Sequence, residues 1–135
     1  MKNMNNRPQM RILLAEDNLA TGRLYKKILE ENGFVVDHAV DGDQALFWCQ
    51  QGGYTLILMD IRMPKRDGLQ VLEELQLNPA EVKNGPIVML TNLTDDALVK
   101  KAMGFGAMSY MDKSNLNPEQ LVEKVNGVLG LPNVE

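Results

Sequence analysis

Short apolar segments alternate with longer amphipathic segments along this chain. Five of the short segments predict β-strands, at residues 10–15, 35–39, 56–59, 87–90 and 110–111. The first, third and fourth are almost uninterrupted runs of Ile, Leu, Val and Met. Such runs are typical of a parallel sheet that helices cover on both faces, because a strand with one face in water alternates apolar and polar residues.

The longer segments predict helices with one apolar side each. Asn117 followed by Pro118 is typical of an N-cap and the first residue of a helix. The expected buried positions are Leu24, Ile28 and Leu29 in the first helix, Leu69, Leu72 and Leu75 in the third, and Leu121, Val122, Val125, Val128 and Leu129 in the last. Alternating strands and helices favour an α/β fold: a flavodoxin-like, doubly wound, five-stranded parallel sheet in the order 2-1-3-4-5, with five helices.

The size and composition of the chain favour a single domain. With 135 residues and 44% hydrophobic content, the chain can bury one core. We expect a flexible leader at residues 1–9, a domain at residues 10–130, and a C-terminal tail or linker stub at residues 131–135.

Several protein classes are disfavoured by the same sequence. The polar start of the chain does not resemble a secretory signal, and the single cysteine, Cys49, has no partner for an internal disulfide, so a cytoplasmic protein is expected. No apolar run approaches the roughly 18 residues that span a bilayer. A net charge of -4 argues against direct binding of nucleic acid.

Charged and hydroxyl side chains follow four of the predicted strands. Glu16 and Asp17 come after the first strand, Asp60 after the third, Thr91 after the fourth and Lys113 after the fifth. In the predicted strand order, ligands bind outside the carboxyl ends of the strands where the order reverses, between the first and third strands. These side chains are therefore expected to converge at one edge of the sheet.

Three carboxylates close together need compensating positive charge. Two unit charges about 4 Å apart repel by roughly 4 kcal/mol at an effective dielectric constant near 20. Lys113 supplies one positive charge, and the remaining excess favours a bound cation. Because the predicted ligands are oxygens, without a nearby His or Cys, Mg²⁺ is favoured, and Mg²⁺ sites usually combine carboxylates with water and phosphate oxygens. Asp60, at the end of a central apolar strand, is then the best candidate nucleophile for phosphoryl transfer.

Four segments in the same order resemble the receiver domains of bacterial response regulators, over about residues 10 to 130. They are ILLAEDN at 12–18, LILMDIRMPKRDG at 56–68, VMLTN at 88–92 and SYMDKS at 109–114. The resemblance implies a two-component signalling switch, which accepts phosphate from a histidine kinase or a histidine phosphotransfer protein and is not an enzyme in the usual sense. It also implies a surface for a homodimer or a downstream partner, built from the fourth helix, the fifth strand and the fifth helix.

The resemblance also implies a role for each site residue. Asp60 would be the phosphoacceptor. The cofactor Mg²⁺ would be bound by Asp17, Asp60 and the backbone carbonyl of Arg62, and by Glu16 through a water molecule. The phosphoryl-binding and switch residues would be Thr91, Tyr110 and Lys113.

Two positions depart from the family pattern. Asn92 stands where the family usually has a small residue, and Ser114 where it usually has proline. Asn92 is expected to narrow access to the phosphoryl group. The peptide bond after Lys113 is expected to be trans, because a non-proline cis bond costs about 2.5 to 4 kcal/mol.

Three other functions are compatible with parts of the pattern. A phosphohydrolase with an aspartate nucleophile would need an acid two residues after Asp60, where Arg62 stands. A flavodoxin-like cofactor binder would need a glycine- or hydroxyl-rich turn after the first strand, where Glu16 and Asp17 stand. A degenerate receiver used only for binding would not need the acidic pair, Asp60, Thr91 and Lys113.

Overall fold

The computed structural model describes residues 9–92 and 96–133, and its strands and helices alternate as predicted. The strands are β1 (Arg11–Ala15), β2 (Val35–Ala39), β3 (Leu56–Asp60), β4 (Ile87–Thr91) and β5 (Ser109–Asp112). The helices are α1 (Leu19–Glu31), α2 (Gly42–Gln51), α3 (Gly68–Leu77), α4 (Asp96–Gly104) and α5 (Pro118–Leu129), and the short 3-10 helix η2 (Lys113–Asn115) follows β5. Residues 1–8 of the predicted leader and 134–135 of the predicted tail lie outside the described residues.

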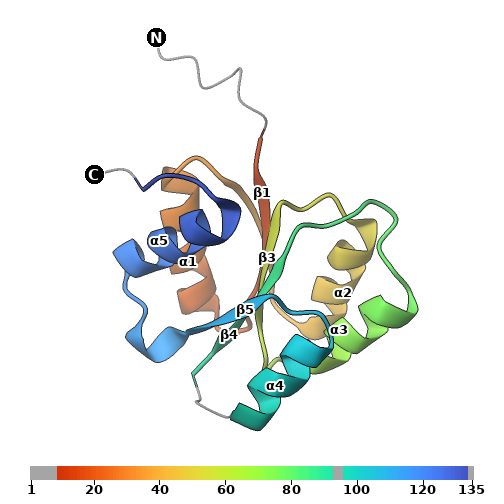
Figure 1. The fold of residues 1–135 in the computed structure, drawn as a ribbon. Helices are drawn as coiled ribbons and strands as arrows, with labels where there is room; N and C mark the ends of the chain where they lie inside the picture. The colour runs from red at the N-terminus through yellow and green to blue at the C-terminus, as the bar shows by residue number, and fades with distance from the viewer. Residues whose placement is uncertain (1–8, 93–95, 134–135) are drawn as a thin grey trace.

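The five strands form one parallel sheet in the order β2-β1-β3-β4-β5, which confirms the predicted topology. Helices α1 and α5 cover one face of the sheet, and α2, α3 and α4 cover the other (Figure 1). In the register of the sheet, Ala15 lies beside Ala39 and Met59, and Thr91 lies beside Asp112. The carboxyl ends of neighbouring strands therefore meet at a single edge.

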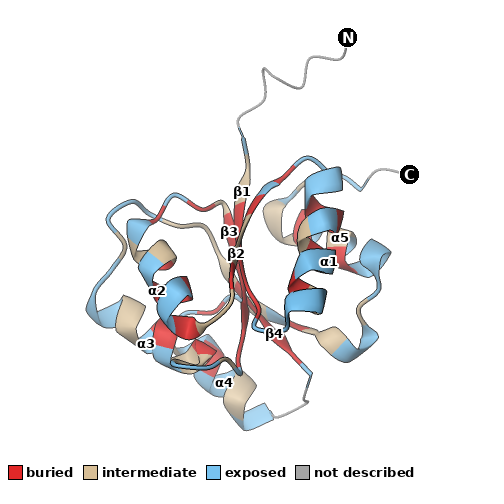
Figure 2. Cartoon of the chain, turned by 180° about the vertical axis from the view of Figure 1, so that it is seen from behind, coloured by how far each residue is buried: buried red, intermediate tan, exposed pale blue. Residues whose placement is uncertain are grey.

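A separate apolar core fills each face of the sheet. Successive side chains of a strand point to opposite faces, so Leu13 joins the cluster under α2, α3 and α4, while Ile12 and Leu14 join the cluster under α1 and α5. Figure 2 shows the central strands as almost continuously buried. Burying a side chain such as leucine contributes about 1.5 to 3 kcal/mol, which explains why the second, third and fourth positions of β1, β3 and β4 are all apolar.

The buried side of α1 differs from the prediction. Ile28 and Leu29 are buried as expected, but Leu24 is 51% exposed and the prediction for it was wrong. The adjacent Tyr25 is buried instead and packs with the α1, α5 cluster. At 100° per residue, the arc centred on Tyr25, Ile28 and Leu29 leaves Leu24 beyond its edge.

The ends of the helices follow the predicted chemistry. Asn117 caps α5 through a hydrogen bond from the backbone N–H of Gln120 at 2.8 Å, and Pro118 lies in the first turn, which confirms the predicted start. Asp67 caps α3 in the same way, with Gln70 as its partner at 2.8 Å. Within residues 9–92 and 96–133, none of the helices has the length and apolar character needed to cross a membrane.

A polar cluster ties together β1, β2 and the start of β3 at the edge opposite the carboxyl ends of the strands. The Tyr54 hydroxyl donates to Asp37 Oδ2 at 2.7 Å, and the guanidinium of Arg11 lies 4.5 Å above the Tyr54 ring. Burial and the neighbouring Asp37 carboxylate raise the pKa of Tyr54. The phenol therefore stays a hydrogen-bond donor at neutral pH.

Candidate functional site

The predicted site residues meet at the carboxyl edge of the sheet, with the exception of Tyr110. A pocket of about 350 Å³ is lined by Glu16, Asp17, Asp60, Arg62, Thr91 and Lys113. Tyr110 does not line this pocket, and its side chain on β5 is 48% exposed.

Asp60 and Glu16 share the ammonium group of Lys113. Lys113 Nζ lies 2.7 Å from Asp60 Oδ2 and 2.7 Å from Glu16 Oε1. Asp60 is the last residue of β3 and Lys113 the first of η2, so the sheet brings together two residues 53 positions apart in the chain. Asp60 Oδ1 also accepts the backbone N–H of Arg62 at 3.2 Å.

The Glu16 side chain has no exposed surface, and hydrogen bonds from several directions hold the residue in place. Its Oε2 accepts the backbone N–H of Asn18 at 3.0 Å, and its own N–H donates to the carbonyl of Ala39 at 2.9 Å. The Asn18 side chain in turn caps α1, through Thr21 N–H at 3.0 Å. The start of α1 is therefore built around the Glu16 carboxylate.

The charges of the site shift two pKa values. Burial, together with the charge of Glu16, raises the pKa of Asp60 even though Lys113 lowers it. Burial alone would lower the pKa of Lys113, but its hydrogen bonds to Asp60 and Glu16 outweigh burial, and the pKa is raised. The charged form of Lys113 is stabilised by two carboxylates at once. The negative charge of Asp60 has only a share of one ammonium group to balance it.

The acidic residues have the geometry of a cation site. One carboxylate oxygen from each of Glu16, Asp17 and Asp60 lies within 4.8 Å of the others. Glu16 and Asp60 are buried, whereas Asp17 is exposed, and all three line the pocket. These three oxygen donors, with one ammonium group to offset them, suit a hard divalent cation such as Mg²⁺.

The loop after Asp60 is held against the start of α2. The backbone N–H of Gly42 donates to the carbonyl of Pro64 at 3.1 Å. Two ion pairs flank this contact: Lys65 with Asp41 at 3.5 Å and Arg66 with Asp43 at 2.7 Å. Arg62, whose carbonyl was predicted as a metal ligand, lies in the same loop two residues before Pro64, and its own N–H bonds Asp60 Oδ1.

The structure places both departures from the family pattern, Asn92 and Ser114. Asn92 is exposed and lines the pocket. The described residues contain no cis peptide bond, so the bond after Lys113 is trans as expected. Ser114 donates its N–H to Asp112 Oδ1 at 3.0 Å, which makes Asp112 the cap of η2.

Sequence reasoning missed two residues next to the acidic cluster. Tyr25 lines the pocket from α1. His38 lies on the edge strand β2, as expected, but its Nε2 also donates to the backbone carbonyl of Glu16 at 2.8 Å. The sequence feature that could have pointed to His38 is Gly22, because a glycine inside a predicted helix often has a packing reason, such as the close approach of another side chain.

Gly22 makes room for the His38 ring. A Cβ atom at Gly22 would lie 2.1 Å from Cε1 and 2.2 Å from Nε2 of His38. Glycine to alanine in an open helix stabilises a protein by up to about 1 kcal/mol. Here we expect Gly22→Ala to lower the free energy of unfolding by about 1 to 2 kcal/mol, because the ring must leave its hydrogen bond to Glu16.

A urea-unfolding cycle with His38→Ala tests this prediction. In the His38→Ala background, the same Gly22→Ala change should become neutral or stabilising. A stabilising effect of Gly22→Ala in the presence of His38 would contradict the predicted clash.

Comparisons with known proteins place this geometry in a family. Residues 12–126 match the family model described as the response regulator receiver domain. The chain is 34% identical over 123 residues to the chemotaxis protein CheY of Treponema pallidum, which covers 88% of this chain and 82% of that protein. It is 31% identical over 121 residues to the transcriptional regulatory protein ResD of Bacillus subtilis, covering 90% of this chain and 48% of ResD.

Solved structures give the same result. The receiver domain protein of Methanospirillum hungatei, described as CheY-like, superposes with a TM-score of 0.80 at 28% identity and covers 91% of this chain and 95% of that one. Several relatives are much longer than this chain, which spans 48% of ResD and 15% of the gliding motility regulatory protein of Myxococcus xanthus.

Proposed function

This chain belongs to the response regulator receiver domain family, a signalling domain of two-component systems, and from that premise we propose that it is a phosphoacceptor whose acceptor is Asp60. The observation that carries the proposal is the buried Asp60 carboxylate at the end of β3, 2.7 Å from the Lys113 ammonium group. A nucleophile in phosphoryl transfer needs positive charge close to the transferring group, and Asp60 has such charge in direct contact. The proposed domain comprises residues 10–130.

The proposed reaction moves one phosphoryl group from a phosphohistidine to Asp60. A carboxylate oxygen of Asp60 attacks phosphorus, and the bond from phosphorus to the imidazole nitrogen of the donor breaks. The nitrogen keeps the electron pair and takes a proton from solvent. Lys113, released from Asp60 by the loss of the free carboxylate, bonds a phosphoryl oxygen instead, and the Thr91 hydroxyl bonds another.

The residues present fit Mg²⁺ as the cofactor. Asp17, Asp60 and the carbonyl of Arg62 would bind it directly, and Glu16 would act through a water molecule. When bound, the cation neutralises charge on the carboxylates and on the phosphoryl oxygens. Lys113 supplies only one charge against the three carboxylates of the cluster, so the transfer should require the cation.

Phosphorylation with a small phosphodonor tests the acceptor. Incubating the protein with acetyl phosphate and Mg²⁺ should add one phosphoryl group, seen by mass spectrometry of the intact protein. Asp60→Asn should abolish the gain, because an amide is not a nucleophile for this reaction. Asp67→Asn, which changes an aspartate in the same loop that only caps α3, is the matched control and should leave the gain intact. Modification that persists in Asp60→Asn would sink the assignment.

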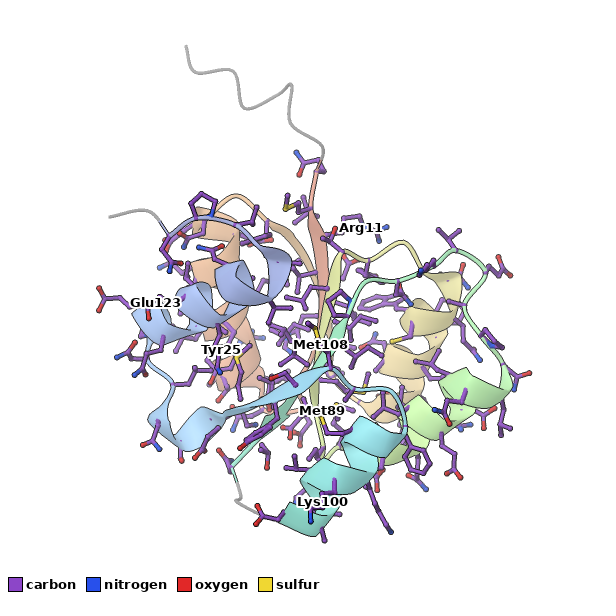
Figure 3. All side chains as sticks on the ribbon, in the orientation of Figure 1. Arg11, Tyr25, Met89, Lys100, Met108 and Glu123 are labelled. Atoms are coloured by element: carbon purple, nitrogen blue, oxygen red, sulfur yellow. The ribbon has the colours of Figure 1, made fainter. Side chains whose placement is uncertain are left out.

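The proposed output surface consists of α4, β5 and α5. Tyr110 on β5 is exposed, as are Met103 at the end of α4 and Met108 just before β5. Figure 3 labels Lys100 on α4 and Met108 near β5 on this side of the molecule. Exposed apolar groups beside lysines suit a protein partner or a second copy of the chain.

Phosphorylation should reach this surface through Thr91. Thr91 ends β4 and is buried beside the pocket, and α4 begins at Asp96. Movement of its hydroxyl toward a phosphoryl oxygen would shift the start of α4 and let Tyr110 turn inward. A partner that prefers this arrangement would stabilise the phosphorylated state by its differential affinity.

Beryllofluoride, a mimic of the phosphoryl group, tests this coupling. Added with Mg²⁺ to the wild type, it should change the amide chemical shifts of residues 97–106 and of Tyr110. In Thr91→Ala these changes should fall to a small fraction, while residues around Asp60 still respond. Equal changes in the two proteins would rule out the Thr91 route.

The donor would be a histidine kinase or a histidine phosphotransfer protein in the cytoplasm. The alternative of a phosphohydrolase is less well supported, because the pocket offers the exposed Arg62, not an acid, two residues after Asp60. A purely degenerate receiver would not explain why Glu16 and Asp60 both contact Lys113.

A further inference from the structure

Tyr25 occupies two environments at once. Its side chain is only 6% exposed and packs in the cluster between α1, α5 and the sheet. Tyr25 also lines the pocket that contains Asp60 and Lys113. Figure 3 labels it on the α1, α5 side of the sheet, near the middle of α1. A side chain that is buried in the core therefore also borders the proposed phosphoryl site.

The geometry of α1 explains how Tyr25 reaches the pocket. Helical side chains tilt toward the N-terminus of their helix, and α1 begins at Leu19, beside the acidic cluster. The ring of Tyr25 therefore extends back over Thr21, one turn earlier, and Thr21 also lines the pocket.

The Tyr25 hydroxyl has no hydrogen-bond partner among the described residues. No fully buried side-chain oxygen or nitrogen in that part of the protein lacks a partner, so this hydroxyl keeps some accessible surface, which agrees with the place of Tyr25 in the pocket lining. The charges of Lys113, Glu16 and Asp60 all act on it, that of Lys113 most strongly. Burial raises the pKa of Tyr25, and the neutral phenol remains a donor.

We infer that Tyr25 is a further phosphoryl-binding residue, whose hydroxyl donates a hydrogen bond to an oxygen of the phosphoryl group on Asp60, next to Lys113. The inference rests on the proposed role of Asp60 as acceptor. Tyr25 keeps its proton throughout, so it changes neither the bond that forms at Asp60 nor the bond that breaks in the donor. Its effect is to stabilise the added negative charge with a neutral donor.

Core packing alone does not account for this tyrosine. A phenylalanine would fill the same space in the cluster that includes Leu14, Ile28 and Leu29 without bringing a hydroxyl toward charged groups. Lys113 supports the inference, because its ammonium group bonds Glu16 and Asp60 in the pocket that Tyr25 also lines. A phosphoryl group on Asp60 would therefore enter a space that both side chains border.

Beryllofluoride binding at saturating Mg²⁺ tests the inference in the full chain. We expect Tyr25→Phe to weaken the apparent beryllofluoride affinity by about 3- to 10-fold, the usual effect of losing one hydrogen bond. The affinity for Mg²⁺ alone should not change, because the hydroxyl is not a metal ligand. Tyr54→Phe removes a hydroxyl at the opposite edge of the sheet and should alter neither affinity.

Each outcome separates this inference from the proposed function. Equal beryllofluoride affinities in the wild type and Tyr25→Phe, with Asp60→Asn still inactive, would overturn the inference and leave the acceptor in place. Parallel weakening of Mg²⁺ and beryllofluoride binding in Tyr25→Phe would assign a structural role instead and overturn it too. If the wild type and Asp60→Asn respond alike to beryllofluoride, the acceptor assignment fails and the role of Tyr25 fails with it.

Discussion

Replacing Lys113 with methionine should lower the free energy of unfolding of the metal-free protein by about 3 to 5 kcal/mol at neutral pH, the usual cost of removing one partner from a buried ion pair. The reason is the burial of the groups left behind. Glu16 is 0% exposed and Asp60 6% exposed, and both contact the Lys113 ammonium group at 2.7 Å. Without that group, two buried carboxylates would face each other uncompensated.

This loss of stability should depend on pH and on Mg²⁺. In the wild type, burial already raises the pKa of Asp60, and removing Lys113 would raise it further. The penalty is therefore fully present above the folded-state pKa of Asp60, and it disappears as the pH falls below the unfolded-state pKa and the carboxyl is protonated in both states. Mg²⁺ should also reduce the penalty, because a bound cation supplies the missing positive charge.

Urea unfolding of Lys113→Met at several pH values, with and without Mg²⁺, measures these effects. Lys27→Met is the matched control: Lys27 is exposed on α1, and its replacement should change stability by no more than about 0.5 kcal/mol. A Lys113→Met protein that is as stable as the control at neutral pH would show that the two carboxylates do not depend on the lysine.

The second large effect is expected at Gly42, where the loop after Asp60 meets α2. A Cβ atom at this position would lie 1.9 Å from the backbone oxygen of Arg66, and that oxygen cannot rotate away as a side chain could. Gly42→Ala should therefore lower the free energy of unfolding by about 1 to 3 kcal/mol. The displaced loop also carries the carbonyl of Arg62, so we expect weaker Mg²⁺ binding as well.

Gly127→Ala is the matched control for Gly42→Ala. Gly127 lies inside α5, and apart from its chain neighbours and the backbone of its own helix no atom lies within 4 Å of the added Cβ, so alanine there should raise stability by roughly 0.4 to 1 kcal/mol. Calorimetry for stability and titration with Mg²⁺ measure both variants. Mg²⁺ affinity that is unchanged in Gly42→Ala would show that the start of α2 does not position the loop.

The sequence predicted the sheet and most of the site because both follow from regular rules. Buried parallel strands must be apolar on both faces, which made β1, β3 and β4 easy to recognise. The carboxyl ends of parallel strands meet at one edge, so Asp60 and Lys113 could be placed together without any knowledge of the loops. The resemblance to receiver domains supplied the roles, which chemistry alone left open.

The remaining features depend on three-dimensional context that no local pattern contains. Leu24 and Tyr25 are adjacent, and hydrophobicity alone favours Leu24 for the core, but the rotation of α1 against the sheet decides for Tyr25. Gly22 and His38 are complementary across 16 positions, a pairing that appears only once α1 packs beside β2. Sequence reasoning therefore located the charged centre but not Tyr25, Gly22 and His38, which pack beside it.

The outer strands of the sheet, β2 and β5, each have one edge whose backbone groups are not paired with another strand of the sheet. β2 carries Asp37 and His38, and β5 has only four residues and ends at Asp112. Exposed strand edges template aggregation, and short, charged edges oppose it. The folded chain should therefore resist edge-to-edge polymerisation at high concentration. Aggregation should begin near the unfolding midpoint, when a detached β2 or β5 uncovers the apolar edge of β1 or β4.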